Sequence, residues 1–379
     1  MNYLLKYGEI ALRGKNRHIF EDKLINTVAK TTGARVNKEQ GRLLVRGAKD
    51  LNVLKNIIGI TAICPIDMIE TDELEALKEM VLNHAIKSFE NNFTFKIITK
   101  RANKNYPLTS PEINVELGAY ILENVKGAKV DVKNPQHIIY VELRNYSYCY
   151  SKIIEGIGGL PSGAGRVISL LSGGIDSPVA TFLAARKGLD VTCLYFHSPP
   201  YTTEHAKQKV VDICNNLSKY TGSLNLHIVN FTDIQLFLHK ATEHAKLTIF
   251  LKRAMVKLAE ELAKKQKAFA LIMGDSIGQV ASQTIQSIDV IDDAAENLPI
   301  IRPLATNDKQ DIIEIAKKIG TFDISIRPFE DCCTIFVPKH PETKPDKRTI
   351  KRMERAFEEE LMKKIHTAIE NIEIIRAEV

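Results

Sequence analysis

The sequence predicts an α/β protein in which a doubly wound parallel sheet follows two small α+β domains. Its 379 residues exceed one ordinary domain of roughly 100–200 residues. From residue 166 onward, continuous apolar runs alternate with segments of helical periodicity, which is typical of parallel strands covered by helices on both faces. Between the two parts, residues 156–165 hold five glycines and one proline, as expected of a linker.

The part before the linker contains short helices and strands. Apolar residues at helical spacing predict the helices, and alternating β-branched or aromatic residues predict the strands. A further helix begins at Ser110-Pro111, where a capping residue precedes a proline that suits the first turn. We expect helices at 19–31, 50–58 and 72–91, and strands at 34–38, 42–46, 60–69, 94–100 and 138–153.

The part after the linker alternates strand and helix. We expect strands at 166–171, 190–196, 225–230 and 269–273, and helices at 177–188, 203–220, 243–266 and 306–319. A charged amphipathic helix over 346–370 is expected to end the chain.

Composition excludes several classes of protein. With 44% hydrophobic and 26% charged residues, the chain is neither disordered nor fibrous. It has no apolar run of about 18 residues for a membrane span, and its N-terminus lacks a signal peptide. Six cysteines are too few for a disulfide scaffold, and no C-x-x-C pair suggests an iron–sulfur or zinc site. We therefore expect a cytoplasmic protein with reduced thiols.

Positive charge is concentrated at the N-terminus. Residues 1–50 hold 11 lysines and arginines against 5 acidic residues, which accounts for the whole net charge of +6. This asymmetry indicates a basic face for a polyanion, although a solvated lysine-rich surface would look the same.

A glycine-rich turn follows the first strand of the predicted parallel sheet. The strand at 167–171 leads into Ser172-Gly173-Gly174-Ile175-Asp176-Ser177, and a helix begins near Pro178. In such a turn the backbone N–H groups and the helix N-terminus face an anion. Asp176 would repel a bare phosphate, so it suggests that a magnesium ion lies between them. The pattern is neither that of P-loop kinases nor that of dinucleotide-binding dehydrogenases. The alternative is a turn that binds nothing.

The loop resembles the SGGxDS pyrophosphate loop (PP-loop) of adenylating ATP pyrophosphatases. Further segments, taken in order along the whole chain, resemble the tRNA 4-thiouridine synthetase (tRNA uracil 4-sulfurtransferase) family. These segments are KYGEIALRGK at 6–15, TKRANK at 99–104, FHSPPYT at 196–202, MGDSIGQVASQT at 273–284, RPL at 302–304 and FEDCCTIFVPKHP at 329–341.

This resemblance implies a domain organisation. We expect a ferredoxin-like domain at 1–50, a THUMP RNA-binding domain at 51–155, the linker at 156–165, a PP-loop ATP pyrophosphatase domain at 166–345 and a helical tail at 346–379. Only 46 residues follow Cys333 and none is cysteine, so we expect the short form of the family, without a C-terminal rhodanese domain.

The resemblance also implies a reaction and its partners. ATP, with Mg²⁺, would adenylate O4 of the uracil at position 8 of tRNA, and a cysteine persulfide would deliver sulfur to C4 as AMP leaves. The implied partners are tRNA and a cysteine desulfurase. A thiamine sulfur-carrier protein is a further candidate, because many members supply sulfur for the thiazole of thiamine. A homodimer is another, because a tRNA could span two subunits.

Residue roles follow from the family motifs. The expected nucleotide-binding residues are Leu170, Leu171, Ser172, Gly173, Gly174, Asp176, Ser177, Tyr195, Phe196, Lys252, Gly274 and Gln283. Tyr195 and Phe196 could instead be plain strand core. Lys252 could be a surface lysine, with Arg253 taking its place. Gly274 ends an apolar strand, where we expect the backbone to approach a ligand closely.

The expected catalytic residues are Asp176, Lys309, Cys332 and Cys333. Lys309 begins a helix and would stabilise charge on the α-phosphate, unless it is an ordinary exposed lysine. The resemblance favours Cys332 over Cys333 as the sulfur carrier. Glu330 and Asp331 would raise a thiol pKa there, so activation must come from elsewhere. The expected RNA-binding residues are Arg13, Lys15, Lys100, Arg101 and Lys104.

Two other functions remain open. The chain could be another adenylating enzyme, such as an amidotransferase or a nitrile synthase, although a small substrate would need neither RNA-binding modules nor Cys332. It could also be a non-catalytic RNA-binding protein with a relic nucleotide pocket, although the intact loop argues against that.

Overall fold

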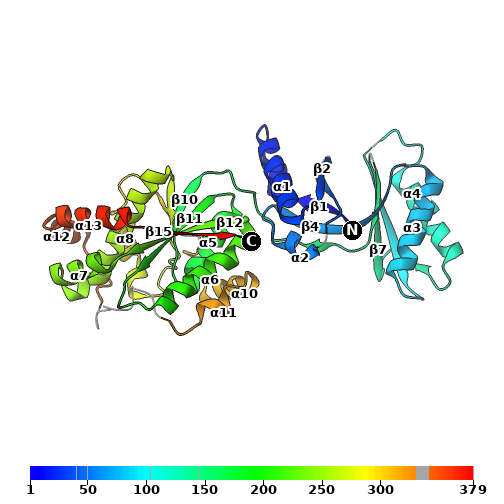
Figure 1. Cartoon of the computed structure of the whole chain (residues 1–379). Coiled ribbons are helices and arrows are strands. Elements are labelled where there is room, and N and C mark those ends of the chain that lie inside the picture. Colours follow the sequence, from blue (N-terminus) through cyan, green and yellow to red (C-terminus); the bar gives the residue numbers. More distant parts are fainter. Residues whose placement is uncertain (40, 49, 103, 145, 330–340, 379) are drawn as a thin grey trace. The chain divides into compact units, whose positions relative to one another are not determined.

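The chain folds into two compact units, Met1–Gly158 and Gly159–Val379 (Figure 1). The computed structural model describes residues 1–39, 41–48, 50–102, 104–144, 146–329 and 341–378. The division between the units falls within the glycine-rich segment 156–165. The boundaries expected within each unit stay predictions. Among the described residues, every helix is too short or too polar to cross a bilayer.

The first unit is built on one mixed sheet with the strand order β2-β3-β1-β4-β8-β7-β5-β6, to which β9 adds by pairing with β4. Its strands are β1 (Asn2–Tyr7), β2 (Arg35–Glu39), β3 (Arg42–Arg46), β4 (Ile60–Ile69), β5 (Thr94–Arg101), β6 (Lys129–Val130), β7 (His137–Leu143), β8 (Ser147–Tyr150) and β9 (Ile154–Glu155). Its helices are η1 (Glu9–Leu12), α1 (Arg17–Thr32), α2 (Leu51–Asn56), α3 (Leu74–Ser88) and α4 (Ser110–Asn124).

Strand β4 joins the two halves of this sheet. Its first part pairs antiparallel with β1, and its last three residues pair antiparallel with β8. Helices α3 and α4 pack against each other on the half that contains β5 and β7, where they bury residues such as Phe95, Leu117 and Ile139 (Figure 1). The ten-residue strand predicted at 60–69 is confirmed, because β4 spans the same residues and pairs with β1 and then with β8.

The single strand expected at 138–153 is wrong. The segment forms two strands, β7 and β8, which pair antiparallel with each other. The turn between them is closed by a hydrogen bond in which the Arg144 N–H donates to the Tyr146 carbonyl. The sequence between the two strands contains neither glycine nor proline, and Arg144-Asn145 was its only turn signal. Strand β1 was also not expected.

The second unit contains a six-stranded sheet with the order β14-β13-β10-β11-β12-β15. Its strands are β10 (Arg166–Leu170), β11 (Asp190–His197), β12 (Ser223–Asn230), β13 (Ala270–Ile272), β14 (Ile300–Ile301) and β15 (Glu373–Glu378). Its helices are α5 (Asp176–Arg186), α6 (Glu204–Thr221), α7 (Thr232–Ala241), η2 (His244–Lys246), α8 (Leu247–Gln266), η3 (Ala281–Gln283), α9 (Ile285–Asp292), α10 (Lys309–Lys318), α11 (Phe322–Ser325), α12 (Lys347–Arg355) and α13 (Glu358–Glu370).

This sheet is doubly wound, as predicted. The five strands from β10 to β14 run parallel. The chain moves outward from β10 to β12 and then returns to place β13 on the other side of β10. Helices cover both faces of the sheet (Figure 1). Ser169 of β10 bonds Thr181 of α5 on one face, while Ile168 packs into the core around α8 on the other. Ligands bind such sheets where the strand order reverses, which here is between β10 and β13.

The helix expected to end the chain over 346–370 is wrong in part. Two helices, α12 and α13, occupy this segment, and strand β15 follows them. Strand β15 pairs antiparallel with β12 and completes one edge of the sheet. Its six residues are mostly exposed, so they carry little of the apolar alternation that marks a strand. Helices α7 and α9 and strand β14 were not expected either.

Candidate functional site

A cleft opens at the carboxyl ends of β10, β11 and β13, beside the reversal of strand order. It is lined by Leu170, Leu171, Ser172, Gly174, Asp176, Ser177, Tyr195, Phe196, Lys252, Met255, Met273, Gly274, Asp275 and Gln283. Eleven of the twelve residues expected to bind nucleotide therefore line one cleft; Gly173 is the exception. Their contact with nucleotide stays a prediction.

The glycine-rich loop is shaped by its own serines. The Ser172 N–H donates to Ser177 Oγ at 2.8 Å, and the two hydroxyl oxygens lie 3.0 Å apart. The Gly174 N–H donates to Ser172 Oγ at 3.3 Å. Helix α5 begins at Asp176, so its first N–H groups and the positive end of its dipole lie at the end of the loop. These hydrogen bonds fix the shape of the loop beside the N-terminus of α5, and its binding of an anion stays a prediction.

At the mouth of the cleft, the Asp176 carboxylate binds the ammonium group of Lys309 and the side-chain amide of Gln279. Lys309 Nζ, from the first residue of α10, lies 2.5 Å from Asp176 Oδ1. Gln279 Nε2 donates to Asp176 Oδ2 at 2.8 Å. The structure therefore brings together two of the expected catalytic residues, which are 133 positions apart in the sequence. Gln279 was not among the predicted residues, although it lies within the quoted MGDSIGQVASQT segment.

A second carboxylate, Asp275, is buried behind the loop. Lys252 Nζ lies 3.0 Å from Oδ1, Gln283 Nε2 donates to Oδ1 at 3.2 Å, and Arg302 Nε lies 3.1 Å from Oδ2. Burial alone would raise the pKa of Asp275, but the charges of Lys252 and Arg302 outweigh burial and hold that pKa below its ordinary value. Sequence reasoning missed Asp275 and Arg302 as site residues. The available signal was the position of Asp275 just after a buried strand, matching that of the loop after β10.

Gly274 allows β13 to approach the glycine-rich loop. A Cβ atom built on Gly274 would lie 2.7 Å from Ser177 Cα and 2.8 Å from Ser177 N. We expected a close approach of a ligand at this position, but the backbone that approaches is that of the loop. The glycine therefore sets the distance between two walls of the cleft.

Gln283 offers an acceptor in the cleft. Gln283 is 7% exposed, and its Nε2 already donates a hydrogen bond to Asp275. Its Oε1 is buried with no hydrogen-bond partner among the described residues. Because a buried acceptor without a partner is costly, this oxygen suits an N–H donor on a ligand, such as the amino group of adenine.

Tyr195 and Phe196 belong to the strand core and also line the cleft, while their contact with nucleotide stays a prediction. Both are almost fully buried in β11, and both line the cleft. Phe196 packs edge-on against Phe231, with ring centroids 5.0 Å apart, so it belongs to the strand core as well.

Arg253 does not take the place of Lys252. Lys252 lines the cleft, whereas Arg253 is 1% exposed and its guanidinium binds Glu354 of α12. Successive residues of a helix point in different directions, which explains why one side chain reaches the cleft and the other does not.

The expected RNA-binding residues differ in their surroundings. Arg13, Lys15, Lys100 and Lys104 are exposed. Arg101 is instead occupied, because its Nη1 donates to the carbonyls of Leu108, at 2.6 Å, and Tyr106, at 3.3 Å. Arg101 thus holds the loop that precedes α4.

Cys332 and Cys333 lie outside the described residues. The other four cysteines, Cys64, Cys149, Cys193 and Cys214, are all buried and free. Burial raises the pKa of the Cys149 thiol well above its ordinary value, which disfavours the reactive thiolate. In the part of the chain that the structure describes, no cluster of three or more histidine, cysteine or acidic residues could hold a metal ion.

Three family models match the chain. The model described as thiamine biosynthesis protein (ThiI) matches residues 162–359, the THUMP domain model matches 71–150, and the ThiI ferredoxin-like domain model matches 2–64. The chain is similar over 98% of its length to a "Probable tRNA sulfurtransferase" of Lachnoclostridium phytofermentans, with 46% identity and 98% of that protein covered. A protein of the same description from Thermoanaerobacter sp. is 45% identical, with 98% and 97% of the two chains covered.

Solved structures give the same result. A crystal structure described as a 4-thiouridine synthetase–RNA complex with bound ATP matches with a TM-score of 0.91 and 37% identity. The match covers 100% of this chain and 99% of the other. The structure of PH1313 from Pyrococcus horikoshii Ot3 shares the fold, with a TM-score of 0.65 and 24% identity over 84% of this chain and 99% of that one.

Replacing Gly274 with alanine should disturb the cleft from behind. The added methyl group would meet the backbone of Ser177, which cannot move without shifting the loop. We expect Gly274→Ala to lower the free energy of unfolding by about 1–3 kcal/mol, as overpacking does, and to weaken ATP binding. Thermal unfolding and calorimetric titration with ATP measure the two effects.

Gly174→Ala is the matched control for stability. A Cβ there would lie 3.5 Å from Ser172 Oγ, which is ordinary contact, so the unfolding temperature should stay close to that of the wild type. Unchanged stability and ATP affinity in Gly274→Ala would contradict the packing described here.

Proposed function

The chain belongs to the ThiI family of tRNA sulfurtransferases, and we propose that it makes 4-thiouridine at position 8 of tRNA. In this proposal ATP adenylates O4 of the uracil, and Cys332 carries the sulfur as a persulfide. The observation that carries it is the pairing of Asp176 with Lys309 on the glycine-rich loop, at the edge of a cleft with a free acceptor for adenine.

The residues at the loop fit a magnesium nucleotide. Magnesium is usually held by one or two carboxylates together with substrate phosphates, and Asp176 supplies such a carboxylate at the loop. When bound, the ion would neutralise charge on the departing pyrophosphate. The loop N–H groups and the N-terminus of α5 would bind the phosphate oxygens.

Lys309 would exchange partners when nucleotide binds. Its ammonium group is exposed and is held by Asp176 through an ion pair that is open to solvent. Such pairs contribute little stability, so the lysine can leave Asp176 for a phosphate. There it would stabilise the negative charge that develops on the oxygens of the α-phosphate, which is the role expected of it from its sequence position.

The chemistry then proceeds in balanced steps. Uracil O4 attacks the α-phosphorus, and pyrophosphate leaves. The terminal sulfur of the Cys332 persulfide attacks C4, and AMP leaves with the original O4. A second thiol attacks Cys332 Sγ, which releases the thiocarbonyl and forms a disulfide; Cys333 or an external thiol would fill this role.

Described residues before and after the cysteine segment contact the loop and the residue that follows Gln283, and these contacts support the proposed role of Cys332. Ser325, seven positions before it, donates its hydroxyl to the Gly174 carbonyl of the loop at 3.1 Å. Lys209 Nζ donates to the Phe329 carbonyl, three positions before Cys332, at 3.2 Å. On the other side, Thr284 donates its hydroxyl to the Thr343 carbonyl at 2.7 Å.

The first unit is proposed to bind tRNA. It contains the THUMP and ferredoxin-like matches, and the 37% identical 4-thiouridine synthetase structure is described as a complex with RNA and bound ATP. The sulfur source, a cysteine desulfurase, stays a prediction. Delivery to a thiamine sulfur-carrier protein, a homodimer and a cytoplasmic location also stay predictions.

Neutralising Lys100 and Lys104 together should weaken tRNA binding without unfolding the protein. Both side chains are exposed, so their removal takes away charge and little else. For each phosphate that the variant no longer binds, the logarithmic salt dependence of affinity should flatten by roughly 0.7–0.9. Arg101→Ala should behave differently and lower thermal stability, because it frees the carbonyls of Tyr106 and Leu108. A salt slope unchanged in Lys100→Ala/Lys104→Ala would show that these lysines do not face RNA.

The sulfur step is tested by two single substitutions. Cys332→Ser should still adenylate tRNA with ATP and release pyrophosphate but should fail to make 4-thiouridine when a desulfurase supplies the sulfur. Concentrated free sulfide should partly restore the yield, because sulfide can attack the adenylated C4 directly. Cys333→Ser should be the milder lesion. Nucleoside mass spectrometry after digestion of the tRNA gives the yield for each variant and donor.

Two outcomes of this experiment would contradict the proposal. Normal desulfurase-dependent yield from Cys332→Ser, with loss in Cys333→Ser, would reverse the roles of the two cysteines. Absence of 4-thiouridine from the wild type with either donor would reject the proposed function.

A further inference from the structure

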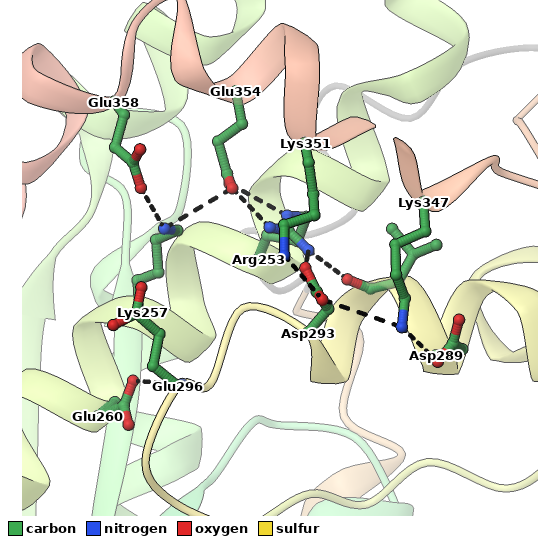
Figure 2. Close-up of polar contacts among 11 residues, drawn as sticks. Arg253, Lys257, Glu260, Asp289, Asp293, Glu296, Lys347, Lys351, Glu354 and Glu358 are labelled. Atoms are coloured by element: carbon green, nitrogen blue, oxygen red, sulfur yellow. Dashed lines mark hydrogen bonds and ion pairs between the residues drawn. The ribbon is translucent and has the colours of Figure 1, made fainter. Parts of the chain in front are cut away.

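Arg253 forms a buried ion pair with the C-terminal helix α12. Glu354 receives Arg253 Nε at 3.1 Å on one carboxylate oxygen and Arg253 Nη2 at 2.5 Å on the other (Figure 2). Arg253 is the largest fully buried side chain in the described part of the protein. Bidentate pairing of this kind fixes orientation as well as distance.

The same guanidinium also binds the end of α9. Arg253 Nη1 donates to the Val290 carbonyl and lies 3.4 Å from Asp293 Oδ2. Arg253 therefore ties three elements together: α8, which carries it, the C-terminal end of α9, and α12 (Figure 2).

Helix α12 is aligned along α9 by two lysines on the face that carries Glu354. Lys347 Nζ lies 2.7 Å from Asp289 Oδ1, and Lys351 Nζ lies 3.1 Å from Asp293 Oδ1. Positions 347, 351 and 354 recur at helical spacing, so one face of α12 supplies all three contacts (Figure 2).

Both helices held by Arg253 lead to the cleft. On α8, the neighbouring Lys252 binds Asp275 at 3.0 Å. Asp292, the last residue of α9, binds Arg302 at 2.6 Å, and Arg302 binds Asp275 at 3.1 Å. One cation on Asp275, Lys252, is therefore carried by α8, and the other, Arg302, is held by Asp292 at the end of α9.

Stability alone does not account for this ion pair. A buried pair costs desolvation, and well-packed apolar residues of similar volume often serve as well or better. What an apolar pair cannot supply is the fixed direction of a bidentate bond. The pair is thus suited to set the rotation of α8 and its spacing from α9.

We propose that Glu354 is a positioning residue for the nucleotide cleft, which acts through Arg253 to hold Lys252 and Arg302 on Asp275. This inference deepens the proposed function, and it rests on that function because it requires the cleft to bind ATP. It places the C-terminal helix α12, far from the loop in sequence, in the support of nucleotide binding.

The test compares Glu354→Gln with Glu358→Gln in the full chain. Glu358, in α13, binds Lys257 of α8 at 2.9 Å but forms no hydrogen bond or ion pair with Arg253 among the described residues, so it is the control for loss of a carboxylate that holds α8. We expect Glu354→Gln to raise the dissociation constant for ATP by roughly 3- to 30-fold, the range seen for residues that couple indirectly to a site. The affinity for tRNA should stay unchanged, and Glu358→Gln should bind ATP as the wild type does.

A double variant separates positioning from packing. Arg253→Met with Glu354→Leu replaces the pair by apolar residues, so neither of its two charges is left buried alone, although Val290 and Asp293 lose their donor. Its unfolding temperature is measured together with its ATP affinity. The proposal expects its ATP affinity to stay reduced all the same. Wild-type ATP affinity in this double variant, or in Glu354→Gln, would overturn the inference while leaving the proposed function intact. Failure of the wild type to bind ATP would reject both.

Discussion

The cleft depends on the binding of the buried Asp275 carboxylate by the side chains around it. A carboxylate removed from water is stable only when donors surround it, and Lys252, Gln283 and Arg302 all converge on this one. Each donor comes from a different part of the chain: α8, the turn before α9, and the segment after β14. Satisfying one charge therefore fixes the positions of three walls at the same time.

The second carboxylate of the site, Asp176, has a contrasting environment. Its partner Lys309 is exposed, and the pair stands at the mouth of the cleft instead of behind it. An ion pair in contact with water can be exchanged for another at little cost in free energy. The site thus combines a fixed electrostatic frame around Asp275 with a pair at the loop that is free to rearrange around a polyphosphate.

The sequence allowed the doubly wound sheet and most of the cleft to be predicted, because buried parallel strands and a glycine-rich turn have strong local patterns. What it could not supply were the long-range contacts. Asp275 looked like one more polar residue after a strand, Arg253 looked interchangeable with Lys252, and Arg101 looked free to bind RNA. Partners distant in the sequence set the roles of Asp275 and Arg253, for example Glu354 for Arg253. The role of Arg101 is set by carbonyls of the nearby loop before α4, which no sequence pattern marks. The exposed strand β15 was missed because pairing with β12, and not its own pattern, makes it a strand.

In the proposed reaction the cleft activates uracil by transferring the adenylyl group of ATP to O4. The most direct test of this step uses tRNA whose uracil at position 8 carries oxygen-18 at O4, incubated with the protein, ATP, magnesium and a sulfur donor. If O4 is adenylated, the label must appear in the phosphate of the AMP that leaves as 4-thiouridine forms, with one labelled oxygen for each thiolated uracil. Unlabelled AMP alongside full thiolation would contradict this account.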